Sequence, residues 1–206
     1  ELVWSHEGLS GLGTPVLTGG LVVFFGPEAA IARNPKTGTE LWRAPFGIDE
    51  PTVAADPWLT NGTLFLSAGY GKGRTLFDVT DRNAIRQLWS REGDENGHIW
   101  ASAVAWREGL YGFTKTGLAS IDWQTGDAIW ERQGLAGSLL ILGDRALVLT
   151  EKGEIHMGPI SVTEPFAPDV IAQVSGGKTW NVPAYVDGKL FVRSDKGDVL
   201  CWRISR

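Results

Sequence analysis

The sequence predicts an all-β protein, a β-propeller built from four-stranded antiparallel blades. Three observations predict it: short apolar runs bounded by Gly-containing turns, a repeated turn that ends in Trp, and a repeat length of about forty residues. The composition agrees, because the 206 residues include 27 Gly and 10 Trp but only one Met. Abundant Gly and Trp suit a repetitive β protein better than a helical one.

The repeated turn occurs twice with the same internal spacing. Residues 34–42 read Asn-Pro-Lys-Thr-Gly-Thr-Glu-Leu-Trp, and residues 122–130 read Asp-Trp-Gln-Thr-Gly-Asp-Ala-Ile-Trp. The opening Asn or Asp can bond the backbone two residues on, and Gly supplies the positive φ of the turn. The closing Trp offers a flat apolar face to a neighbouring blade and an N–H to anchor it.

Five segments share an apolar strand, a Gly or Asp turn and a second apolar strand. The first apolar residue after each turn is Leu21, Leu64, Leu110, Ala146 and Leu190. These residues lie about 36 to 46 positions apart, which fits a propeller blade. The predicted repeats span about residues 11–46, 51–92, 97–133, 136–175 and 179–206 of a single domain, residues 1–206. The fourth repeat has no closing Trp, and its outer half over 159–174 is predicted to be a long hairpin.

The two ends of the chain have complementary patterns. The last repeat stops before an outermost strand, and Glu1-Leu2-Val3-Trp4 has the character of such a strand. We therefore predict five blades, with the N-terminal strand (residues 1–8) completing the last blade and closing the ring, which removes exposed sheet edges. The alternative is that the chain is part of a larger, eight-bladed propeller, and the first residue, Glu1, indicates a processed or excised chain. Cys201 lies in an apolar strand and is predicted to be buried.

At these residues the sequence resembles the quinoprotein-like (PQQ-type) β-propeller repeat family. The outer turn of that family follows the pattern Ala-x-Asp-x-x-Thr-Gly-x-x-x-Trp. Residues 32–42 match it with Asn for Asp, and residues 120–130 match it with Ser for Ala. Residues 67–73 and 110–113 also resemble bacterial envelope-associated members of unknown function. The resemblance implies a periplasmic or extracellular location.

The same family contains both pyrroloquinoline-quinone (PQQ) dehydrogenases and non-enzymatic scaffolds. Its enzymes share an adjacent Cys pair, a calcium ion held by carboxylate and amide ligands, and an Asp base. A chain with one Cys cannot form the pair, and no segment matches the calcium site, so no cofactor is predicted and PQQ has no supporting residues. His6, His98 and His156 lie far apart with no metal-ligand spacing, so no metal is predicted either.

Candidate binding residues follow from propeller geometry. The loops that enter each inner strand and the loops between second and third strands share one face around the axis. Aromatic and cationic residues on such a rim could hold a small anion, a sugar or an acidic loop of a partner. The alternative is that the Trp residues pack between blades and the Lys residues are solvated turn residues. The candidate ligand-binding residues are Asp56, Trp58, Tyr70, Lys72, His98, Trp100, Trp180 and Asn181.

Charge and hydropathy exclude some partners. The net charge of −5 argues against a nucleic-acid binder, and no apolar run approaches the roughly 18 residues of a membrane helix. The favoured function is a non-catalytic scaffold that binds a protein or small ligand on its loop face. One alternative is a PQQ-dependent or sugar-handling oxidoreductase that uses the axial funnel. Another is a half-ring that assembles with a second copy or a missing segment, whereas a closed ring predicts a monomer.

Overall fold

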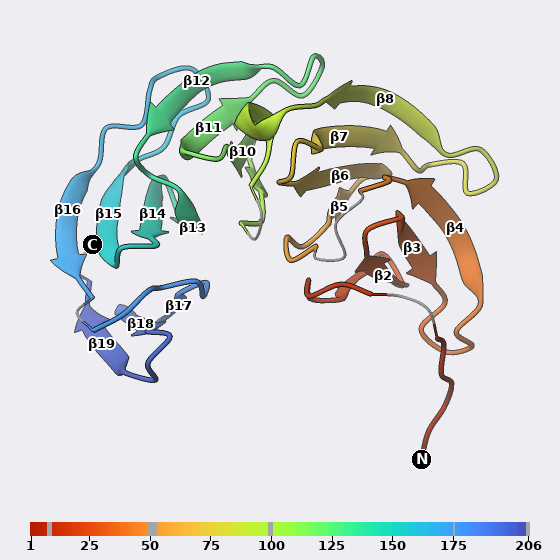
Figure 1. The fold of residues 1–206 in the computed structure, drawn as a ribbon, viewed down its shortest axis with the longest axis horizontal. Helices are drawn as coiled ribbons and strands as arrows, with labels where there is room; N and C mark the ends of the chain where they lie inside the picture. The colour runs from red at the N-terminus through yellow and green to blue at the C-terminus, as the bar shows by residue number, and fades with distance from the viewer. Residues whose placement is uncertain (8–9, 49–52, 99–100, 175, 205–206) are drawn as a thin grey trace.

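The computed structural model describes residues 1–7, 10–48, 53–98, 101–174 and 176–204. Over these residues the chain forms β-strands and one short 3-10 helix, η1 (Asp94–Asn96). The strands form five antiparallel sheets, which stand side by side around a common centre (Figure 1). This arrangement confirms the predicted all-β fold, and the five sheets fit the five predicted blades.

Each sheet is formed by strands that are consecutive in the sequence. The first sheet contains β1 (Val16–Thr18), β2 (Leu21–Phe25), β3 (Ala29–Arg33) and β4 (Glu40–Pro45). The second contains β5 (Trp58–Thr60), β6 (Thr63–Ala68), β7 (Gly73–Asp78) and β8 (Arg86–Arg91). The third contains β9 (Val104–Trp106), β10 (Gly109–Phe113), β11 (Gly117–Ile121) and β12 (Ala128–Gln133). The fourth contains β13 (Gly137–Leu142), β14 (Arg145–Thr150), β15 (Glu154–Pro159) and β16 (Asp169–Gln173). The fifth contains β17 (Ala184–Val186), β18 (Lys189–Arg193) and β19 (Val199–Arg203).

Within a sheet the chain runs from the centre outward. Figure 1 shows β5, β13 and β17 on the inner side of their sheets and β4, β8, β12 and β16 on the outer side. Tight turns make the inner hairpins: Asn61–Gly62 and Asp187–Gly188 have positive φ at both residues, as a two-residue type I′ turn requires. In the fourth sheet, β15 and β16 pair around a long connection, in keeping with the predicted hairpin.

The apolar core lies between neighbouring sheets. Each pair of adjacent sheets shares a cluster of buried apolar side chains. Examples, in order along the chain, are Val23 with Leu64, Phe65 with Leu110, Phe113 with Val148, and Leu147 with Leu190. Because such burial is the main favourable term in folding, the faces between the sheets hold the arc together.

Indole groups connect neighbouring sheets at their outer turns. The Trp89 Nε1–H of β8 donates to the carbonyl of Trp123 at 2.8 Å, and the Trp130 Nε1–H of β12 donates to the carbonyl of Ser161 at 3.1 Å. In each case the Trp belongs to one sheet and the carbonyl belongs to the outer turn of the next. Each contact therefore sets how two sheets sit against each other.

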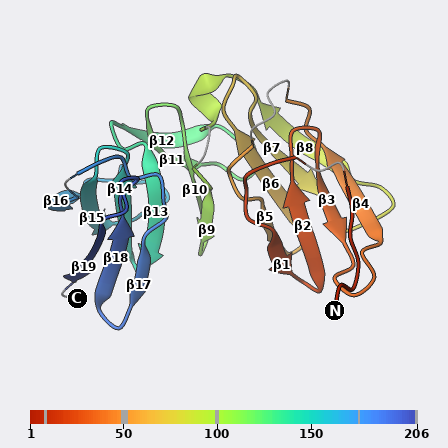
Figure 2. The same cartoon turned by 60° about the horizontal axis from the view of Figure 1, so that its bottom comes forward.

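The predicted position of the N-terminal strand is wrong in this structure. In the described part of the chain the fifth sheet has three strands, and residues 1–7 belong to no sheet. The Trp4 Nε1–H instead donates to the Pro35 carbonyl at 2.8 Å, and the Trp4 ring lies against Gly38. Figures 1 and 2 both show the N-terminal segment on the side of the first sheet, apart from β19. The arc is thus not closed by this segment, and the monomer and the eight-bladed alternative stay predictions.

The prediction that Cys201 is buried is also wrong, because Cys201 is exposed. The reason is its position on β19, which, among the strands that the structure describes, pairs with β18 alone. The third strands β3 and β11 of complete sheets are buried along their whole length, whereas exposed and half-buried residues alternate along β19.

Candidate functional site

Three short polar residues lie at the same repeat position, just before the first strand of their sheets. They are Thr14, Asp56 and Ser102. The Thr14 N–H donates to Asp56 Oδ1 at 2.6 Å, and the Asp56 N–H donates to Ser102 Oγ at 2.9 Å. Asp56 therefore ties together the leading loops of the first three sheets, a leading loop being the segment just before an inner strand.

Gly13 allows this close approach of the leading loops. The N–H groups of Leu12 and Gly13 both donate to the Val53 carbonyl, at 2.7 and 3.1 Å. A Cβ at position 13 would lie 2.9 Å from the Ala55 carbonyl oxygen, so a larger residue would push the two loops apart. The two hydrogen bonds to Val53 fix the backbone beside Asp56, and the absence of a Cβ at Gly13 allows the two loops to approach this closely.

The leading loops and inner strands surround a cavity of about 440 Å³, here called the axial cavity. All five sheets contribute to its lining. Representative residues from successive sheets are Leu17, Asp56, Trp58, Ser102, Ser138 and Trp180. The Ser138 Oγ–H donates to the Asn181 carbonyl at 3.1 Å, which ties the fourth sheet to the loop that leads into the fifth.

The axial cavity is mainly apolar, and its described lining residues include one charged side chain. Among the described residues that line it, Asp56 is the one with an ionisable side chain. Large apolar side chains are exposed there: Leu17 is 73%, Val182 61% and Trp180 49% exposed. Apolar walls with a few placed polar groups are typical of ligand sites.

Three of the predicted site residues, Asp56, Trp58 and Trp180, line this cavity. Asn181 is not among the lining residues, but its backbone carbonyl accepts a hydrogen bond from Ser138, which lines the cavity. The Asn181 side chain turns to the fifth sheet, where Arg193 Nη2–H donates to its Oδ1 at 3.2 Å. The Lys178 Nζ lies 5.0 Å from the Trp180 ring centroid, a cation–π contact that holds the indole beside the cavity.

The other predicted residues are not among those that line this cavity. Lys72 lies in the β6–β7 turn, where its Nζ is 5.3 Å from the Phe46 ring centroid and 4.0 Å from Glu92 Oε1. Tyr70, in the same turn, is 44% exposed and has a φ of 59°. Trp100 lies outside the described residues.

His98 is buried between the third and fourth sheets. Its ring contacts Phe113, and its Nε2 lies 3.7 Å from Glu151 Oε1 in the β14–β15 turn. Burial lowers the pKa of His98 to about 4, so the imidazole is neutral at pH 7. It serves as a packed polar side chain rather than as part of the cavity wall.

The sequence reasoning missed Thr14, Ser102 and Ser138, which position the site. For Thr14 and Ser102 a signal existed: aligning the repeats puts both at the position of Asp56. Ser and Thr are common in loops, so their short polar side chains do not by themselves indicate a site.

The cavity does not fit the quinone cofactor of the PQQ enzymes. Pyrroloquinoline quinone carries several carboxylate groups, and no Lys, Arg or His is among the described lining residues, whereas Asp56 would repel it. The described residues also contain no group of three His, Cys, Asp or Glu side chains able to hold a metal ion. No helix among them is long and apolar enough to span a membrane.

Comparison with known proteins supports the repeat assignment. Residues 1–139 match the family model described as outer membrane protein assembly factor BamB. A protein of that name from Xanthomonas campestris pv. campestris is 27% identical over 209 residues, covering 93% of this chain and 48% of that protein. The chain therefore spans about half the length of this curated relative.

Solved structures show the same fold. BamB from Moraxella catarrhalis matches with a TM-score of 0.71 and 18% identity, over 98% of this chain and 60% of that chain. Quinohemoprotein alcohol dehydrogenase from Comamonas testosteroni matches with a TM-score of 0.63 and 12% identity, over 100% and 45% of the two chains. Because the family match covers more than half of the sequence, this chain belongs to the outer membrane protein assembly factor BamB family of PQQ-type repeat propellers.

Proposed function

We propose that this protein is a non-catalytic propeller scaffold that binds an extended segment of a partner protein at the axial cavity. The observation that carries the proposal is the cavity itself, whose lining combines contributions from all five sheets with exposed apolar side chains. Exposed apolar surface gathered in one concave place is typical of an interaction site.

The leading loops favour binding because they are already ordered. Asp56 forms hydrogen bonds with Thr14 and Ser102, and Ser138 forms a hydrogen bond with Asn181. A partner that binds these loops does not have to order them, which lowers the entropic cost of association.

The family membership supports a protein partner in the bacterial envelope. The curated relative is named an assembly factor for outer membrane proteins, and we propose that this chain has a related role in the periplasm. The fold alone does not decide between roles, since the alcohol dehydrogenase has it too.

Photo-crosslinking tests the proposal with two matched positions in the whole protein. Val182 is 61% exposed, lies just before β17 and lines the cavity, whereas Val186 is 54% exposed and is the last residue of β17. Each would be replaced by benzoylphenylalanine in cells that make the whole protein. We expect a covalent adduct with an envelope protein from position 182 and none from position 186. Adducts from position 186 alone, or the same adducts from both, would contradict the proposal.

A further inference from the structure

Asp56 places a carboxylate in an apolar wall of the axial cavity. Within the described parts of the chain, no Lys, Arg or His side chain forms an ion pair with Asp56. The Thr14 N–H is the group that donates to its Oδ1. A half-buried carboxylate of this kind attracts a positive charge more strongly than a fully solvated one, because water screens it less.

The walls beside Asp56 also favour a cation with an apolar stem. Trp58 and Trp180 both line the cavity, and indole faces attract ammonium and guanidinium groups. Trp180 already has Lys178 5.0 Å from its ring centroid, but Lys178 is not a lining residue. The exposed side chains of Leu17 and Val182 can cover the methylene groups of a long basic side chain.

From these contacts we infer that the axial cavity selects a Lys or Arg side chain of the partner segment, flanked by apolar residues. The inference rests on the proposed function and names the partner chemistry at the same site. The basic group donates to the Asp56 carboxylate, and the flanking residues bury Leu17 and Val182. A basic partner residue is opposite in charge to the small anion or acidic loop expected from the sequence. That expectation depended on cationic residues such as Lys72, but Lys72 is not among the residues that line the cavity and lies beside Glu92.

Three peptides test this selection by isothermal titration calorimetry with the whole protein. They are acetyl-Gly-Leu-X-Leu-Gly-amide with Lys, Gln or Glu at X. We expect the Lys peptide to bind about tenfold more tightly than the Gln peptide, and the Glu peptide to bind most weakly. Added salt should reduce the preference for Lys, because it screens a half-exposed charge pair.

Two matched variants separate Asp56 from a general charge effect. Asp56→Asn keeps the size of the side chain and an oxygen for the Thr14 N–H, and it should abolish the preference for Lys over Gln. Asp144→Asn makes the same charge change on the exposed β13–β14 turn and should leave the preference intact. Circular dichroism melts would check that both variants fold.

The results that overturn the inference are distinct from those that overturn the scaffold proposal. Equal or tighter binding of the Glu peptide, a Lys preference that survives Asp56→Asn, or no binding of any peptide contradicts the basic-residue selection. If the crosslinked adduct still forms at position 182, partner binding at the cavity stands and only the selection is wrong. If no adduct forms there, the scaffold proposal itself fails.

Discussion

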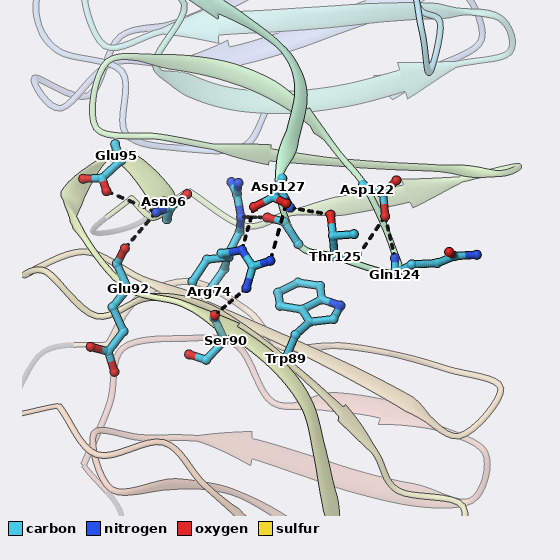
Figure 3. Close-up of polar contacts among 12 residues, drawn as sticks. Arg74, Trp89, Ser90, Glu92, Glu95, Asn96, Asp122, Gln124, Thr125 and Asp127 are labelled. Atoms are coloured by element: carbon cyan, nitrogen blue, oxygen red, sulfur yellow. Dashed lines mark hydrogen bonds and ion pairs between the residues drawn. The ribbon is translucent and has the colours of Figure 1, made fainter.

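Arg74 on β7 donates a hydrogen bond from Nε to the carbonyl oxygen of Gly126 at 2.9 Å, across 52 residues of sequence. Arg74 is 1% exposed, and burial lowers its pKa to about 10, against an opposing effect of Asp127. Figure 3 shows Arg74 and Trp89 of the second sheet reaching toward the outer turn of the third, residues 122–127. This turn is thus held by the neighbouring sheet as well as by its own.

Arg74→Ala should destabilise the protein by about 3 kcal/mol, because it removes a buried side chain and leaves the Gly126 carbonyl without this donor. Arg86→Ala is the control, since Arg86 pairs with Asp78 but its side chain is 70% exposed, and it should cost less than about 1 kcal/mol. Urea denaturation would measure both changes. Equal losses would show that the contact between the sheets contributes little.

Gly126→Ala should destabilise more than Gly134→Ala. Both glycines have positive φ, 78° and 82°, so Ala at either position costs about 1 kcal/mol of backbone strain. At position 126 the added Cβ would also lie 2.6 Å from the Trp89 ring, whereas nothing lies within 4 Å at position 134. Thermal melts of the two variants isolate this clash, and equal melting temperatures would contradict it.

Trp89→Phe should cost about 1 kcal/mol more than Trp58→Phe. Both residues pack in the same cluster between the second and third sheets, so both substitutions remove apolar ring area from that cluster. Only Trp89 loses a hydrogen bond, the one to the Trp123 carbonyl. The Trp58 Nε1 is buried and has no hydrogen-bond partner among the described residues, so Phe removes an unsatisfied donor. Guanidinium denaturation would measure the unfolding free energy of both variants. A larger loss of stability for Trp58→Phe would show that the Trp89 hydrogen bond does not make the difference.

Stability should fall as the pH drops from about 6.5 toward 4, in part because of His98. Its folded pKa of about 4 lies below the ordinary histidine pKa of 6.5, so the unfolded chain binds the proton more readily in this window. The contribution of His98 is complete above pH 6.5 and declines by up to ~1.4 kcal/mol per pH unit below it.

The measurement is the difference in unfolding free energy between the wild type and His98→Gln as a function of pH. His98→Gln should flatten this part of the pH profile, whereas His6→Gln, at an exposed position, should leave it unchanged. A profile with the same slope in the wild type and in His98→Gln would contradict the assignment to His98.

The turns were predictable because their chemistry is local. The Asp122 carboxylate accepts the N–H groups of Gln124 and Thr125, and the Asn34 side chain accepts that of Lys36. Gly126 adopts the positive φ that the turn needs. All these contacts join residues within one turn, so the pattern of residue types is enough to predict the fold and its repeat.

The candidate site was only partly predictable. Repeat alignment placed Asp56, Trp58 and Trp180 near the axis, where the structure has them. The same alignment placed Lys72 and His98 on the rim, but Lys72 lies against Phe46 and Glu92, and His98 is buried against Phe113. The repeat fixes where each loop lies in the sequence. The direction in which a loop side chain points depends instead on which residues of the neighbouring sheet it can pack against.

The sequence by itself determined the repeat, the turns and the strand order, since these depend on residues close together in the chain. The tertiary structure alone decided that Trp4 contacts the turn of the first sheet, that β19 pairs with β18 alone among the described strands and that Cys201 is exposed. It also decided that the Asp56 carboxylate lies in the wall of the axial cavity. These outcomes depend on contacts between segments far apart in sequence, where several arrangements satisfy the same local pattern and packing selects one.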